Sequence, residues 1–82
     1  MNDAETFDVH RPAMLLRAFR MLADMERAEE MLHEAWLRWQ RRQMSVDDPR
    51  EFLLSIVTQI CLDDLSARVR REHRDRAPAA RN

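Results

Sequence analysis

The chain contains no glycine in its 82 residues, and this absence is the strongest constraint on its fold. Glycine-rich turns normally connect the strands of small β proteins, and the sequence also lacks the strict polar–apolar alternation of strands. Alanine, leucine, methionine, arginine and glutamate dominate instead, and all are good helix formers. We therefore expect one small all-α domain.

Two helices are predicted in the first half of the chain. Pro12 fits the first turn of a helix over residues 11–23, after a loose turn in residues 1–10. Asp24 is a plausible N-cap for a second helix over residues 25–42. At about 100° per residue, the apolar residues of the second helix form one core stripe: Ala28, Met31, Leu32, Ala35, Trp36 and Trp39. Packing, rather than base stacking, is the expected role of both tryptophans.

The third predicted helix has the clearest start. Asp48, Pro49 and Glu51 carry the signature of a capping box with proline as the first helical residue. The next residues are apolar on nearly every side, so we expect this helix to be the central one. The sequence thus predicts a three-helix bundle over residues 1–76, whose long third helix ends in a basic extension. Residues 77–82 are predicted to be a flexible tail or the start of a linker.

The charge is nearly balanced, with 14 arginines, no lysine and 15 acidic residues, for a net charge of -1. This balance argues against a free-standing, strongly basic DNA-binding protein. Residues 1–48 hold ten acidic residues and seven arginines, whereas residues 49–82 hold five and seven. The positive charge therefore lies toward the end of the third helix.

Several classes of protein find no support in the sequence. Cys61 is the single cysteine, so neither a disulfide nor a cysteine-rich zinc site can form within one chain. The apolar runs are too short to span a bilayer and no signal peptide is evident, so we expect a cytoplasmic protein without membrane contact. No motif indicates an enzyme or a bound cofactor. Glu29 and His33 have a spacing that allows at most a weak surface metal contact, and an ordinary solvated helix face is the better interpretation.

Two surfaces are candidate binding sites. On the second helix, opposite the tryptophans, lie Glu30, His33, Glu34, Leu37 and Arg41. They form either a docking face for a partner or a plain solvated face. The arginines at the end of the third helix form either a phosphate-contacting surface or a solvated helix end.

Three blocks of the sequence together resemble a known family. The stretch "RPAMLLRAFRMLADMERAEEMLHEAWLRWQ" is similar to the pattern "RP.LL..AYRMLGS..DAEDVVQ" followed by "AWLRW". After it, "DPREFLLSIVTQICLDDL" is similar to "DPRAWLL.VVTNLCLD.L". These blocks resemble the second conserved domain of extracytoplasmic-function (ECF) sigma factors, the bacterial initiation subunits of RNA polymerase. The resemblance covers about residues 7–76.

The resemblance implies a module that binds core RNA polymerase, at the clamp of its largest subunit, and the non-template strand of the promoter minus-ten element. It implies polymerase contacts at Glu30, His33, Glu34, Leu37 and Arg41. Residues 43–48 match the family's specificity loop, which captures a flipped base, and the implied contacts are Met44, Ser45, Val46 and Asp47. The polar strip and basic end of the third helix would follow the DNA strand at Gln59, Ser66, Arg68, Arg70 and Arg71. An anti-sigma factor is a further implied partner.

Some interface positions depart from the family pattern. Glu30 stands where the pattern has Asp, His33 where it has Gln, Gln59 where it has Asn, and Ser66 where it has Arg. An alternative hypothesis follows from these departures: a sigma-like protein–protein interaction module that has lost initiation and acts as a decoy, binds an anti-sigma factor or self-associates.

Overall fold

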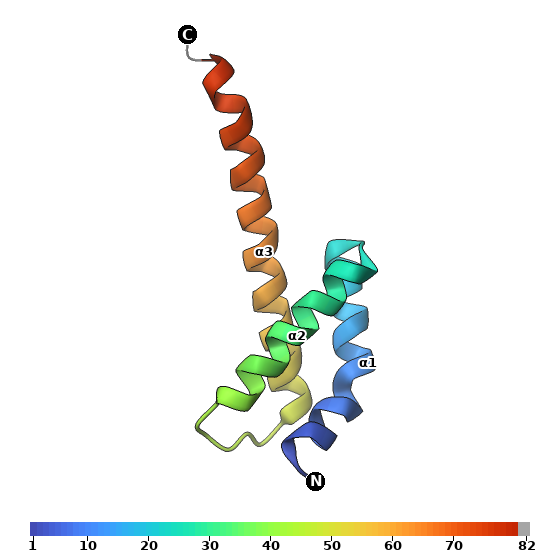
Figure 1. Cartoon of the computed structure of the whole chain (residues 1–82). Coiled ribbons are helices and arrows are strands. Elements are labelled where there is room, and N and C mark those ends of the chain that lie inside the picture. The colour runs from blue at the N-terminus through green and yellow to red at the C-terminus, as the bar shows by residue number, and fades with distance from the viewer. Residues whose placement is uncertain (81–82) are drawn as a thin grey trace.

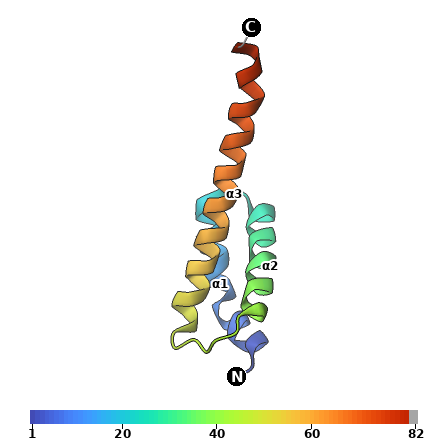
Figure 2. The same ribbon diagram turned by 90° about the vertical axis from the view of Figure 1, so that its left-hand side faces the viewer.

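The computed structural model describes the backbone of residues 1–80 and the side chains of residues 1–75. It contains three helices: α1 (Asp3–Leu22), α2 (Met25–Arg41) and α3 (Pro49–Ala80). Each helix packs against the other two, and α3 continues well beyond them (Figures 1 and 2). The predicted all-α, three-helix architecture with a long third helix is confirmed. The tail expected at residues 77–82 lies outside the residues whose side chains are described.

The first helix begins at Asp3, not at residue 11 as the sequence analysis expected. A capping box forms at its start: Asn2 Oδ1 accepts the Glu5 N–H at 2.8 Å, and Glu5 Oε1 accepts the Asn2 N–H at 3.0 Å. Phe7 is buried in the core, which anchors this early segment. Pro12 therefore lies inside α1 and not in its first turn.

A sharp connection joins α1 to α2. Ala23 ends α1 in the left-handed conformation, with φ 56° and ψ 32°, and its N–H donates to the Phe19 carbonyl at 2.7 Å. Asp24 then caps α2, as predicted, by accepting the Arg27 N–H at 3.1 Å. The chain makes this turn with alanine at a position where glycine is usual.

All three helices contribute to one hydrophobic core. The predicted stripe of α2 is confirmed, because Ala28, Leu32, Ala35 and Trp39 are buried and Met31 and Trp36 pack against them. Aromatic contacts tie the stripe to its neighbours: the Phe7 and Trp36 ring centroids are 5.1 Å apart, and those of Trp39 and Phe52 are 5.9 Å apart. Both tryptophans therefore serve packing.

The third helix is not central, contrary to the prediction. It has 32 residues, whereas α1 and α2 have 20 and 17 and can cover only its first half. Leu62 lies within that first half but, at about 100° per residue, points away from the buried side of α3, and it is 47% exposed. Val69, on the extension, is exposed as well. The apolar composition of this segment predicted more burial than the bundle provides.

Polar contacts between helices fix their arrangement. The Arg27 guanidinium of α2 pairs with the Asp64 carboxylate of α3. Arg17 of α1 donates to Thr58 Oγ1 of α3 at 2.9 Å. A third contact, from Arg42 to Asp3, joins the end of α2 to the start of α1.

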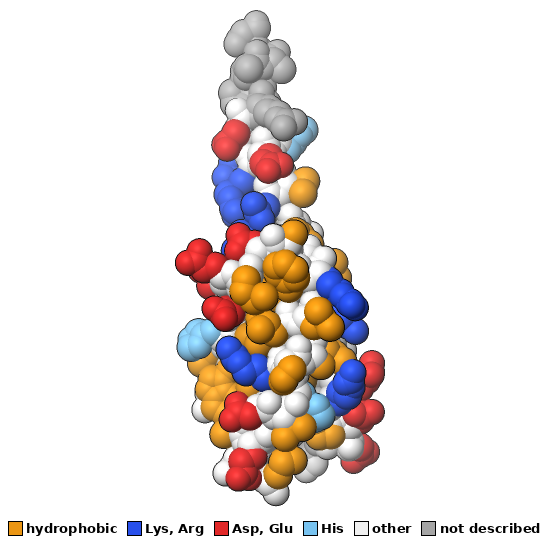
Figure 3. Space-filling view, turned by 90° about the vertical axis from the view of Figure 1, so that its right-hand side faces the viewer, with side chains coloured by type: hydrophobic (Ala, Val, Ile, Leu, Met, Phe, Trp, Pro, Cys, Tyr) orange, Lys and Arg blue, Asp and Glu red, His pale blue; other side chains and the backbone are white. Residues whose placement is uncertain are grey.

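The side of α1 that faces away from the core carries hydrophobic side chains. Figure 3 looks onto this side of the molecule, where orange side chains extend along the bundle between charged groups. Val9, Leu16 and Phe19 are among the exposed large hydrophobic residues. They are not part of the core cluster.

Candidate functional site

The side of α2 that faces away from the core carries the predicted docking residues. Glu30, His33 and Arg41 are exposed, and Glu34 and Leu37 are half-buried. None of the five belongs to the hydrophobic core. These five residues form what we name the docking face of α2.

Two residues of the docking face differ in detail from the expectation. Leu37 is half-buried, not exposed. Glu34 accepts a hydrogen bond from Arg38 Nε at 3.3 Å. An exposed pair of this kind contributes only about 0.3–0.5 kcal/mol. Glu34 can therefore exchange this partner for another at little cost.

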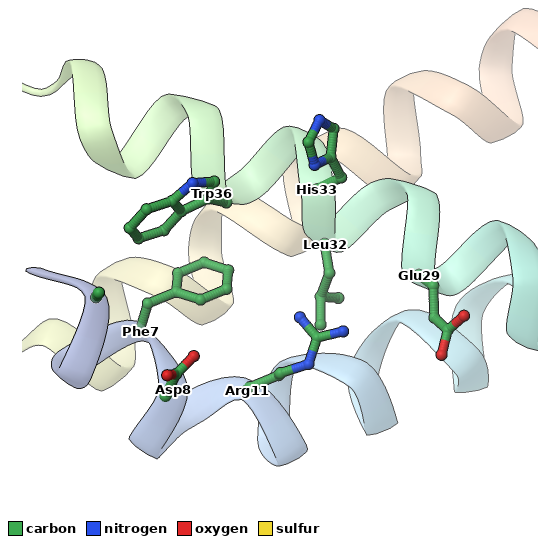
Figure 4. A pocket seen from close by; sticks show the side chains of 8 residues that line it. Phe7, Asp8, Arg11, Glu29, Leu32, His33 and Trp36 are labelled. Atoms are coloured by element: carbon green, nitrogen blue, oxygen red, sulfur yellow. The ribbon is translucent and has the colours of Figure 1, made fainter.

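A groove of about 280 Å³ lies between α1 and α2, beside the docking face. Its apolar floor is formed by Phe7, Leu32 and Trp36. In Figure 4, Leu32 and Arg11 point toward each other across the groove, and His33, at its edge, points away from α1. The remaining lining residues are Ala4, Asp8, Arg11 and Glu29.

The sequence did not predict the α1 wall of this groove. Residues 1–10 were expected to form a loose turn, so Ala4, Phe7 and Asp8 were not placed against α2. Two signals could have found them. The spacing of Asn2 and Glu5 is that of a capping box, and Phe7 is in helical phase with Met14.

The connection between α2 and α3 presents the predicted loop residues. Met44, Ser45 and Asp47 are exposed, and Met44 is 63% exposed. Val46 instead packs partly against the core and holds the middle of the loop. Asp48 fixes the end by accepting the Glu51 N–H at 3.2 Å, which is the N-cap contact that the sequence predicted. The loop thus offers three side chains from an anchored backbone.

Arg42 fixes the start of the same loop. Its guanidinium lies 3.5 Å from the centroid of the Trp39 ring and donates to the Trp39 carbonyl at 2.8 Å. It also donates to both Asp3 carboxylate oxygens, at 2.9 and 3.2 Å. The hydrogen bond from Arg42 and its positive charge hold the pKa of Asp3 below its usual value, although burial opposes this.

The predicted strand-following residues divide into two groups on α3. Gln59, Ser66 and Arg70 are exposed and, at about 100° per residue, share one side of the helix. Ser66 and Arg70 also line a shallow apolar hollow with Leu62, Leu65 and Val69. Gln59 Nε2 donates to Asp63 Oδ1 at 3.1 Å, so a carboxylate lies within this strip.

Arg68 and Arg71 lie on a different side of α3. About 100° of rotation per residue directs them toward the side that faces the core lower down the helix. At their level α3 has passed the bundle, so Arg71 is exposed and Arg68 half-buried. The extension therefore presents positive charge in more than one direction. The side chain of Arg76 lies outside the described residues.

The described residues offer little for other chemistry. They contain no group of three or more His, Cys, Asp or Glu side chains that could hold a metal ion. Cys61 is buried, and burial raises the pKa of its thiol, which keeps it protonated and unreactive. Within the described part of the chain, no helix combines the length and apolar character needed to cross a membrane.

Comparisons with known proteins bear on these surfaces. A family model described as "Sigma-70 region 2" matches residues 6–73. The chain is 35% identical over 71 residues to "ECF RNA polymerase sigma factor SigJ" of Mycobacterium tuberculosis (strain ATCC 25618 / H37Rv), and this match covers 85% of this chain and 23% of that protein. It is 40% identical over 65 residues to "Probable ECF RNA polymerase sigma factor SigI" of Mycobacterium tuberculosis (strain CDC 1551 / Oshkosh), which covers 77% of this chain and 22% of that protein.

The chain thus spans less than a quarter of the length of these curated relatives. No solved structure matches it.

Proposed function

The chain belongs to the sigma-70 region 2 family, in its ECF branch, and from that premise we propose that it recognises and melts the minus-ten element of a promoter. In this proposal its partners are core RNA polymerase and the non-template DNA strand. It acts by binding and catalyses no reaction.

The docking face of α2 is the proposed contact with the clamp of the largest polymerase subunit. Exposed Glu30 can pair with basic side chains of the clamp, and Leu37 can contribute apolar contact from its half-buried position. The weak bond between Glu34 and Arg38 leaves that carboxylate available for exchange.

The loop and α3 are the proposed DNA contacts. A base that leaves the duplex loses stacking and pairing energy of a few kcal/mol, and a preformed pocket can offset this cost. The loop is suited to this role because Arg42, Val46 and Asp48 hold its backbone while Met44, Ser45 and Asp47 stay exposed. On α3, Arg70 and Arg71 would bind phosphates, with the remaining proposed contacts at Gln59, Ser66 and Arg68.

One observation carries the proposal. The match to the family runs over residues 6–73 and so includes all three helices and the loop between α2 and α3. None of the fourteen residues proposed to contact polymerase or DNA is fully buried, and only Val46 among them packs against the core.

A binding assay with core RNA polymerase tests the polymerase half. We expect the chain to be retained by immobilised core enzyme and Glu30→Arg to weaken retention about tenfold or more, because a carboxylate facing basic groups becomes a repelling charge. Glu72→Arg is the matched control, since it makes the same change at an exposed site on the α3 extension. Equal retention of both variants would contradict a polymerase contact on α2.

Binding to single-stranded minus-ten DNA tests the other half. Affinity should fall with rising salt, because arginine–phosphate contacts release counterions. Arg70→Ala and Arg71→Ala should each weaken binding and reduce the salt dependence, whereas Arg11→Ala on α1 should leave both unchanged. Salt dependence that is the same in all three variants would argue against a DNA surface on α3.

A second candidate function is that of a protein-binding module that has the same fold but does not initiate transcription. The hydrogen bond from Gln59 to Asp63 favours it, because a carboxylate in the strip would repel a DNA strand. In that case the docking face and the groove beside it would bind a protein such as an anti-sigma factor. Binding of a helical protein partner, without binding of polymerase or DNA, distinguishes this function from the first.

A further inference from the structure

Three arginines from two helices line one hollow between α1 and α3. The hollow has a volume of about 140 Å³, which is room for several water molecules. Its lining residues are all basic or apolar: Arg17 and Arg20 of α1, Arg50 of α3, and Ala13, Leu16 and Leu54. We name this site the arginine hollow.

The arginines of the hollow are exposed, and their charges are not balanced by the described side chains. Arg17 donates to Thr58 Oγ1 at 2.9 Å, and this acceptor is neutral. Arg20 and Arg50 make no ion pair with any side chain that the structure describes. Other arginines of the bundle do pair with carboxylates: Arg27, Arg38 and Arg42.

The positions around these arginines in the sequence explain why their charges stay unbalanced. Arg17 and Arg20 are three residues apart and so lie side by side on α1, a spacing at which like charges destabilise a helix. The residues one turn before Arg17 are Ala13 and Met14, and those one turn after Arg50 are both leucine. Folding therefore brings three positive charges together, and a bound anion would remove their repulsion.

We propose that the arginine hollow binds a terminal phosphate group or the phosphate chain of a small molecule such as a nucleotide. Guanidinium groups bind phosphate oxygens through paired, charge-assisted hydrogen bonds. Leu54 is 8% exposed and gives the hollow an apolar floor, which strengthens such contacts by lowering the local dielectric constant. A terminal phosphate carries about two negative charges at neutral pH, whereas each phosphate of a nucleic-acid backbone carries one. Three guanidinium groups therefore match a terminal phosphate better than a backbone phosphate.

This hollow is separate from the surfaces of the proposed function. At about 100° per residue, Arg50 lies on the opposite side of α3 from Gln59 and Arg70. Arg68 shares the side of Arg50 but lies about 27 Å further along the helix, at about 1.5 Å per residue. The inference thus does not depend on the proposed function: phosphate binding can fail while polymerase binding holds, and the reverse.

Thermal unfolding of the 82-residue chain with millimolar sodium pyrophosphate, at constant ionic strength, tests the proposal. The melting temperature should rise with pyrophosphate concentration, because the ligand binds only the folded chain. Arg20→Gln and Arg50→Gln should each raise the Kd for pyrophosphate about tenfold, since each removes a hydrogen bond between charged groups. Arg11→Gln is the matched control, with the same substitution on α1 outside the hollow, and should keep the original Kd.

Two outcomes of this titration overturn the site. One is a melting temperature that pyrophosphate does not change. The other is an equal rise in the original chain and all three variants, because multivalent anions also stabilise folded proteins without a specific site.

The repulsion within the hollow is tested without pyrophosphate at low salt. Arg20→Gln should then melt about 1–4 °C above the original chain, because it relieves the repulsion from Arg17. Arg11→Gln should show no such rise. A melting temperature that Arg20→Gln lowers would mean that the charge of Arg20 is already balanced, and it would overturn the proposal.

A comparison of two ligands distinguishes the possible sources of the phosphate. Adenosine triphosphate should lose affinity for Arg20→Gln as pyrophosphate does. Any binding of a single-stranded oligonucleotide without terminal phosphates should be the same for Arg20→Gln and Arg11→Gln. If Arg20→Gln weakens oligonucleotide binding at least as much as that of adenosine triphosphate, the hollow binds a nucleic-acid backbone and the assignment to a terminal phosphate is wrong.

Discussion

Trp39 joins three parts of the chain at the scale of a single residue. Its ring packs against Phe52 of α3, its indole N–H donates to the Asp3 carbonyl at 3.0 Å, and Arg42 lies over its face. Helical spacing was enough to predict that Trp39 is a packing residue. The contacts themselves could not be predicted, because Asp3 is 36 positions away and was expected in a loose turn.

Leu32 lies in the core stripe of α2, whereas Leu37 lies on its docking face. Leu32→Ala should lower the free energy of unfolding by about 2–5 kcal/mol, because it leaves a cavity in the core. Leu37→Ala should lower it by about 1 kcal/mol or less, yet weaken polymerase binding. Urea denaturation and the polymerase assay together check this pair. If Leu37→Ala proves as destabilising as Leu32→Ala, Leu37 belongs to the core and not to a docking face.

Asp3 gives the stability of the fold a dependence on pH. Its pKa is lowered in the folded chain, chiefly by the hydrogen bond from Arg42, so its contribution to stability is full above the ordinary pKa of an unfolded aspartate. The contribution is lost as the pH falls through the lower, folded pKa. Asp3→Asn should therefore have a reduced melting temperature at neutral pH and approach the original chain in acid.

Asp47→Asn is the control for this experiment, because it changes an exposed loop carboxylate. Its melting curve should follow that of the original chain throughout. If the melting temperature of Asp3→Asn stays below that of the original chain by the same amount down to strong acid, the charge of Asp3 is not the cause of the difference.

At the scale of the helices, the sequence predicted the existence and order of all three, and it placed the starts of α2 and α3 correctly. Local residues mark these two starts: an acidic N-cap precedes each helix, and proline is the first residue of α3. The start of α1 was wrong because Pro12 was given more weight than the capping residues before it. The burial of α3 was overestimated because α1 and α2 cover only one side of its apolar half, and this depends on how the three helices pack, not on α3 alone.

The end of α1 provides a prediction about a helix terminus. Ala23 has φ 56°, a conformation that costs residues other than glycine about 1–2 kcal/mol. Ala23→Gly should raise the free energy of unfolding by about 0.5–1 kcal/mol, after the greater freedom of glycine in the unfolded chain is subtracted. Ala13→Gly, inside α1, should instead lower it by about 1 kcal/mol. Equal effects of the two substitutions in urea denaturation would contradict the role of the left-handed cap.

At the scale of the whole molecule, the surfaces divide among different sides of one small bundle. The periodicity of α2 separated the docking face from the core stripe correctly, because both follow from one helix. The grouping of Gln59, Ser66 and Arg70 on one side of α3 follows from helical periodicity and was predicted. The exposure of Arg71 on the other side was not, because it depends on where α3 leaves the bundle. The groove between α1 and α2 was not predicted either, because it depends on how these two helices pack against each other.

The central claim is that this region 2 chain docks on polymerase through the outer side of α2. Photo-crosslinking tests it most directly, with a photoreactive amino acid at position 37 and the same group at position 62 on α3 as the control. We predict that position 37 crosslinks to the largest subunit of core RNA polymerase and that excess unmodified chain competes the product away. A crosslink from position 62 but none from position 37 would contradict the claim, and so would a product at position 37 that does not respond to competition.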